Sequence, residues 1–215
     1  MKFLGIVLAF ILNSTMVFGQ DIYDVVIDND YNRTIHVKTS NSEYVKFEGY
    51  FDTYSAFDIA SVLEYSELSE LRLNSNGGML LSAYQLGFYI ENNNISVVID
   101  KDSICVSACA FSAIRSKNLV INNEGLLFHL PYTLEMGIHE TLEEFKKMND
   151  VSLSLMIRYL RELNFSLDFI DILVYESGIK RFVVIENIED IEHFKSDNFL
   201  EEISAEGRYK IVETP

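Results

Sequence analysis

The sequence has 215 residues, 48% of them hydrophobic, and a formal net charge of −16. This length and hydrophobic content predict one domain with one substantial core. The acidic excess argues against nucleic acid as a partner, because phosphate binding needs clustered lysine and arginine, and it equally disfavours anionic membrane surfaces.

Residues 1–19 have the pattern of a secretory signal peptide, with Lys2 before the apolar run Phe3–Leu12 and a cleavage site near Gly19–Gln20. An uncleaved anchor helix is the alternative, but the run is well short of the ~20 residues that a membrane span needs. We therefore expect an exported protein, periplasmic or secreted, without stable membrane insertion. Cleavage removes Lys2 and no acid, which changes the net charge from −16 to −17.

The remaining chain divides into an N-terminal β-hairpin extension (20–43), a main domain (44–200) and a polar C-terminal tail (201–215). Alternating or continuous apolar residues predict the hairpin strands, Ile22–Ile27 and Thr34–Lys38, and a further strand at Tyr44–Phe51. Helical spacing of apolar residues then predicts a helix at Ser55–Tyr65.

The stretch from residue 71 to 132 contains two strand-to-helix junctions. Its elements are a strand at Leu71–Asn74, a glycine turn at Gly77-Gly78, a helix at Met79–Ile90, a strand at Ile95–Ile99, a helix at Cys105–Ile114 and a strand at Gly125–Phe128. Strands that alternate with helices predict a parallel sheet, whose ligands lie beyond the carboxyl ends of its strands. We therefore expect Gly77, Ser107 and His129 to share one crevice.

The later part of the chain is less informative. Thr141–Leu163 is predicted as one helix or as two that divide at Asn149-Asp150, followed by a strand at Val183–Ile185 and a short helix at Ile188–Phe194. Two other histidines, His36 and His139, are interpreted as ordinary residues outside the site.

The two cysteines, Cys105 and Cys109, allow two interpretations. On a helix, four rises of about 1.5 Å separate their Cα atoms by about 6 Å, which is within the disulfide range. They form either a disulfide across the turn at Ser107 or two buried free thiols. A zinc site is disfavoured, because two cysteines without a nearby histidine provide too few ligands.

Ser107 and His129 fit a nucleophile and its base. A serine hydroxyl needs a base to take its proton, and a neutral imidazole suits that task near pH 7. Attack on an acyl carbon creates an oxyanion, which backbone N–H groups at a helix start and a glycine turn can stabilise.

The motifs Asn74-Ser75-Asn76-Gly77-Gly78, Cys105-Val106-Ser107-Ala108-Cys109 and Phe128-His129-Leu130-Pro131 resemble the Clp-protease/crotonase superfold. They are most similar to exported ClpP-like predicted periplasmic proteins, whose serine lies in a C-x-S-A-C motif. The resemblance implies an α/β fold of repeated β-β-α units with a mainly parallel sheet. It also implies that Gly78 and Ala108 supply the oxyanion-binding N–H groups.

The same resemblance implies a third member of a catalytic triad. Counting back from Arg181-Phe182 as in the resembling proteases gives Glu176, with Asp171 as the fallback and a Ser–His dyad as the remaining alternative. Because the resembling proteases assemble into rings, a homo-oligomer is implied, unless the N-terminal hairpin caps that interface.

The sequence thus predicts an exported serine hydrolase, preferably a peptidase, with a peptide or protein substrate and no metal or organic cofactor. A catalytically inactive binding scaffold is the alternative, since Asn76 stands where the family usually has proline. A crotonase-type acyl-CoA enzyme is a third alternative. It is disfavoured because CoA is chiefly intracellular and the sequence lacks an evident basic cluster for its phosphates.

Overall fold

The structure is a computed structural model that describes residues 22–28, 33–38, 43–131, 142–177, 181–195 and 207–213, with backbone alone for 22–28 and 142–149. The predicted signal peptide, His139 and most of the predicted C-terminal tail lie outside the described residues.

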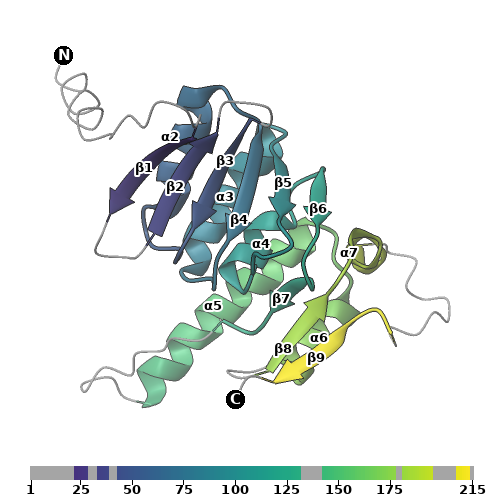
Figure 1. Ribbon diagram of the computed structural model, residues 1–215. Helices are drawn as coiled ribbons and strands as arrows, with labels where there is room; N and C mark the ends of the chain where they lie inside the picture. Colours follow the sequence, from purple (N-terminus) through teal and green to yellow (C-terminus); the bar gives the residue numbers. More distant parts are fainter. Residues whose placement is uncertain are drawn as a thin grey trace.

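A six-stranded sheet organises the first half of the chain (Figure 1). Its strands follow one another in chain order: β1 (Ile22–Asp28), β2 (Arg33–Lys38), β3 (Tyr44–Glu48), β4 (Glu70–Asn74), β5 (Ser96–Ile99) and β6 (Leu119–Ile121). β1 and β2 form an antiparallel hairpin, β2 pairs antiparallel with β3, and β3 to β6 run parallel. The expected mixed α/β class with a largely parallel sheet is confirmed.

The strand before His129 differs from its prediction. β7 (Leu126–Phe128) does not extend the parallel sheet but pairs antiparallel with β8 (Arg181–Ile185), which pairs antiparallel with β9 (Lys210–Glu213). The place beside β5 is taken by β6, a strand of three residues that is too short to give a periodic signal. This second sheet lies at the opposite end of the molecule from the hairpin (Figure 1).

Helices α2 (Ser55–Ser66) and α3 (Leu80–Asn92) cover one face of the large sheet (Figure 1). The other helices within the described ranges are α4 (Ala108–Ala113), α5 (Leu142–Glu162), α6 (Leu167–Glu176) and α7 (Ile188–Lys195). α5 is one continuous helix, so the predicted division at Asn149-Asp150 does not occur. Its first turns project beyond the sheet (Figure 1).

The core lies between the large sheet and its helices. Alternate residues of β3, β4 and β5 are buried there, among them Phe47, Leu73 and Ile99, each with 0% exposure. The opposite face of the sheet is polar, and Arg72 there forms ion pairs with Glu70 and Asp100. The alternation explains why these strands were recognisable from the sequence.

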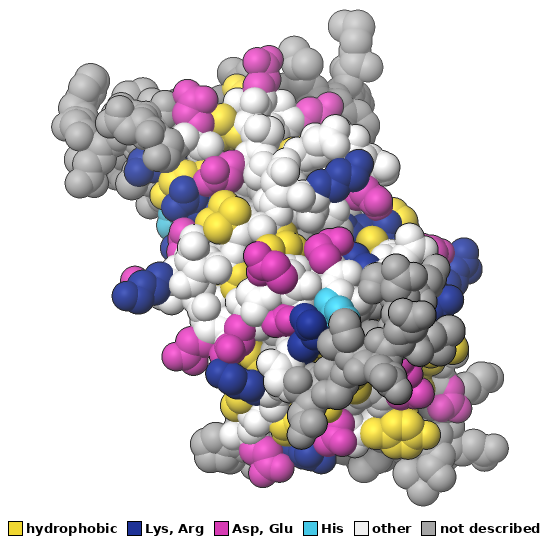
Figure 2. Space-filling model, turned by 90° about the vertical axis from the view of Figure 1, so that its right-hand side faces the viewer, with side chains coloured by type: hydrophobic (Ala, Val, Ile, Leu, Met, Phe, Trp, Pro, Cys, Tyr) yellow, Lys and Arg dark blue, Asp and Glu magenta, His cyan; other side chains and the backbone are white. Residues whose placement is uncertain are grey.

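The surface mixes charges of both signs. Figure 2 shows acidic and basic side chains interspersed over one side of the molecule. Among the ion pairs of the chain, Arg208 pairs with Asp190 and Lys210 with Glu186. Within the described ranges, no helix combines the length and the apolar character needed to cross a membrane.

Candidate active site

Ser107 occupies an unusual backbone conformation at a sharp strand-to-helix turn. Its φ of 53° and ψ of −116° lie in a region that L-amino acids rarely adopt, and α4 starts at the next residue. Such a conformation costs roughly 1–3 kcal/mol and tends to persist at functional sites. A serine on a strained strand-to-helix turn is also how hydrolases expose a nucleophilic hydroxyl.

The segment before Ser107 is held on both sides by backbone hydrogen bonds. On one side, Ser75 N–H donates to Ile104 O at 2.8 Å, and Val106 N–H donates to Ser75 O at 3.0 Å. On the other side, Leu127 N–H donates to Cys105 O at 3.0 Å, and Ser107 N–H donates to Leu127 O at 2.7 Å. This segment therefore connects the end of β4 to β7, and so joins the two sheets.

The glycine turn after β4 contacts Ser107 directly. A Cβ placed on Gly77 would lie 2.8 Å from Ser107 Cβ and 2.8 Å from Val106 O, so only glycine fits there. A Cβ on Gly78 would lie 2.2 Å from Phe51 O. Both glycines also have positive φ, +99° and +141°. The predicted proximity of the glycine turn to Ser107 is present.

Gly78 and Ala108 each carry a backbone N–H that has no acceptor among the described residues. Ala108 is the first residue of α4, where helices leave N–H groups without an intrahelical partner. Its nitrogen lies 3.4 Å from the Cβ position of Gly77, so the two donors belong to one turn cluster. Such a pair can bind an oxyanion.

His129 follows β7, two residues beyond the Leu127 carbonyl that accepts the Ser107 N–H. Its ring is largely buried and lies edge-on to Phe182, with 5.2 Å between ring centroids. Nδ1 lies 2.6 Å from Leu130 O, and since a carbonyl can only accept, Nδ1 carries the hydrogen. In the neutral ring Nε2 is then the basic nitrogen.

Burial also keeps His129 neutral. Removal of the imidazole from water lowers the pKa of His129 below its ordinary 6.5, and the hydrogen bond to Leu130 opposes this shift only in part. A neutral imidazole at neutral pH is the form that can accept a proton from a serine.

The proposed acids, Glu176 and Asp171, lie on α6. The Glu176 carboxylate accepts a hydrogen bond of 3.2 Å from Arg181 Nη2, and Asp171 is exposed. The role of Glu176 as third triad member stays a prediction, since His129 Nδ1 contacts the carbonyl of Leu130.

Cys105 and Cys109 form a disulfide that brackets Ser107, which confirms the first of the two interpretations. Their Cα atoms are 5.1 Å apart, closer than helical spacing gives. The expectation of a helix from Cys105 was wrong, because the chain is strand-like up to Ser107 and turns there into α4. Both cysteines are fully buried.

Metal ligands do not gather in the described ranges, where no three histidine, cysteine, aspartate or glutamate side chains form a cluster suited to an ion.

Two serines that support the site were missed in the sequence. Ser75 Oγ accepts the Gly77 N–H at 3.0 Å, and Ser177 Oγ accepts the Leu130 N–H at 3.0 Å. Ser75 carried a local signal, because a serine two residues before a glycine favours this kind of turn. Ser177 carried none, since its partner is 47 residues away.

A scan of known protein families finds no matching model for this chain, and a search of curated proteins finds no similar sequence.

Proposed function

We propose that the protein is an exported serine hydrolase, preferably a peptidase of the ClpP-like kind, acting on a peptide or protein substrate. The observation that carries this proposal is the Ser107 backbone at φ 53°, next to two N–H groups without acceptors among the described residues. A serine that only filled space before α4 would have no need of this conformation, whose energetic cost neighbouring interactions must offset.

The proposed reaction is acyl transfer through Ser107. His129 Nε2 takes the hydroxyl proton as Ser107 Oγ attacks the acyl carbon, and the N–H groups of Gly78 and Ala108 donate to the resulting oxyanion. The C–N bond then breaks, and the leaving amine takes the proton from Nε2. Water attacks the acyl-enzyme with the same assistance, which releases a carboxylic acid and restores the serine.

In this proposal the Leu130 carbonyl fixes the tautomer of His129, and of the alternatives that the sequence left open we propose the Ser–His dyad. A carbonyl gives the imidazolium less stabilisation than a carboxylate would, because it carries only a partial charge. The disulfide across Ser107 fits an oxidising compartment, which agrees with export to the periplasm or the medium.

A fluorophosphonate probe tests the nucleophile. The wild type should be labelled, whereas Ser107→Ala should not be. Ser112→Ala is the matched control, because Ser112 lies on α4, the helix that follows Ser107, but is fully buried and donates to Cys109 O. Labelling of Ser107→Ala at the wild-type rate would exclude Ser107 as the nucleophile.

A catalytically inactive binding scaffold is the second candidate. The engagement of Glu176 by Arg181 favours it, because a triad would need that carboxylate at the histidine. Peptide or ester turnover by the wild type that His129→Ala abolishes would exclude a scaffold without activity.

A further inference from the structure

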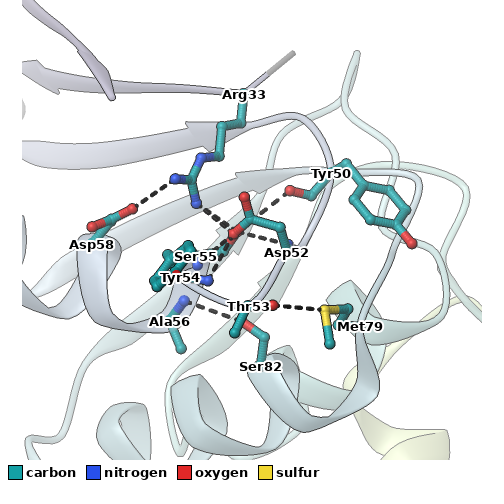
Figure 3. Close-up of polar contacts among 10 residues, drawn as sticks. All are labelled: Arg33, Tyr50, Asp52, Thr53, Tyr54, Ser55, Ala56, Asp58, Met79 and Ser82. Atoms are coloured by element: carbon teal, nitrogen blue, oxygen red, sulfur yellow. Dashed lines mark hydrogen bonds and ion pairs between the residues drawn. The ribbon is translucent and has the colours of Figure 1, made fainter. Parts of the chain in front are cut away.

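A buried ion-pair cluster joins the N-terminal hairpin to the main domain (Figure 3). It consists of Arg33 at the start of β2, Asp52, and Ser55 and Asp58 on α2. The Arg33 side chain is 4% exposed and the Asp52 side chain 7%. Arg33 Nη1 lies 2.6 Å from Asp52 Oδ1, and Nη2 lies 3.0 Å from Asp58 Oδ2. Each of these buried charges needs its partner, because a buried charge without a partner would destabilise the fold strongly.

Asp52 Oδ1, the oxygen that pairs with Arg33, also holds the turn that follows Phe51. Besides Arg33, its Oδ1 accepts from Tyr54 N–H at 2.8 Å, from Ser55 N–H at 2.9 Å and from Ser55 Oγ at 2.9 Å (Figure 3). Arg33 therefore neutralises the carboxylate on which this turn is organised.

Phe51, the residue before Asp52, is hydrogen-bonded through its backbone to the glycine turn of the candidate active site. Phe51 N–H donates to Gly77 O at 2.9 Å, and Met79 N–H donates to Phe51 O at 2.7 Å. The peptide between Gly77 and Gly78 is trans, so its C=O and N–H point in opposite directions. With the Gly77 carbonyl held by Phe51, the Gly78 N–H must point away from Phe51. The orientation of this oxyanion donor thus depends on where Phe51 lies.

We propose that Arg33 is a positioning residue for the Gly78 N–H. Through Asp52 and Phe51, the guanidinium of the hairpin fixes the direction of one oxyanion donor, which gives the N-terminal extension a role in the reaction. This inference rests on the proposed hydrolase function, since a donor needs an oxyanion to bind.

Steady-state hydrolysis of an activated ester by Arg33→Met tests the inference. Removing one oxyanion donor typically lowers kcat by about 10²–10³-fold, and a misdirected donor should lose about 10²-fold with KM within about twofold. Arg33→Lys should lose only about tenfold, because an ammonium keeps the charge but cannot bridge both carboxylates. Should Arg33→Met fail to fold, Arg33→Lys carries the test.

Arg115→Met is the matched control. Arg115 is equally buried, at 4% exposure, and is paired with Glu91 and Glu162, but it has no bond to Phe51 or to the glycine turn. End-point titration with a fluorophosphonate gives the folded fraction of each variant, so that kcat refers to active molecules. Arg115→Met should keep kcat within about twofold even though its melting temperature falls.

Two results would overturn the inference while the proposed function stands: equal kcat losses in Arg33→Met and Arg115→Met, or an Arg33→Met variant that changes only in melting temperature. A wild type whose hydrolysis is unaffected by Ser107→Ala would overturn both.

Discussion

Gly77→Ala is the sharpest test of the geometry around Ser107. The new methyl would meet Ser107 Cβ and Val106 O, both at 2.8 Å, at a residue with φ of +99°. A left-handed backbone costs an L-residue about 1–2 kcal/mol, and overpacking of this kind adds about 1–3 kcal/mol. We therefore expect the free energy of unfolding to fall by about 2–5 kcal/mol, and hydrolysis to fall as well because Ser107 must shift.

Gly207→Ala separates the two contributions. Gly207 has a similar φ of +88°, but within the described ranges no atom outside its chain neighbours lies within 4 Å of its Cβ position. This variant should lose about 1–2 kcal/mol at most, partly offset by the reduced entropy of the unfolded chain. Urea unfolding measures the free energy of unfolding of both variants, provided that the m-value is unchanged. If Gly77→Ala lost no more stability than Gly207→Ala, the close approach to Ser107 would be refuted.

Three further outcomes follow from the site. Replacing Cys105 and Cys109 by alanine removes a disulfide of sequence separation 4. A disulfide that closes a loop of about five residues stabilises the folded protein by about 2 kcal/mol, so the urea midpoint should fall, and an unchanged midpoint would contradict the bridge. Because burial lowers the pKa of His129, the unfolded chain binds the proton at a higher pH than the folded protein does, so the free energy of unfolding should fall as the pH drops below about 6.5. This fall should be smaller in His129→Gln. The kcat/KM of the wild type should stay on its plateau below pH 6.5. Glu176→Gln and Asp171→Asn should each leave kcat within about threefold, whereas a loss of about 10⁴-fold in the former would place Glu176 in a triad.

The parts of the site that depend on local pattern were predictable. A double glycine after an apolar strand, a serine among small residues and a histidine before a proline each gave a signal within a few positions. The proximity of the double glycine to the serine followed from the rule that ligands lie beyond the carboxyl ends of parallel strands.

Other features depend on partners distant in the chain. Phe128 pairs with Val183, and no pattern near β7 specifies that antiparallel partner. Arg33 looks like a hairpin surface residue until the fold brings Asp52 and Asp58 to it. The conformation of Ser107 is likewise imposed from both sides by β4 and β7, so the sequence around it suggested a helix that starts too early.

The segment that joins the two sheets also sets how the site exchanges hydrogen with solvent. The amides of Val106 and Ser107 donate to opposite neighbours, Ser75 and Leu127, so they exchange only when the respective sheet separates from this segment. The Ala108 amide, one residue further on, donates to no described residue, so no hydrogen bond to either sheet restrains its exchange, although Ala108 itself is buried. Hydrogen bonds to the two sheets therefore protect the amides of Val106 and Ser107, whereas the neighbouring Ala108 amide is protected by burial alone.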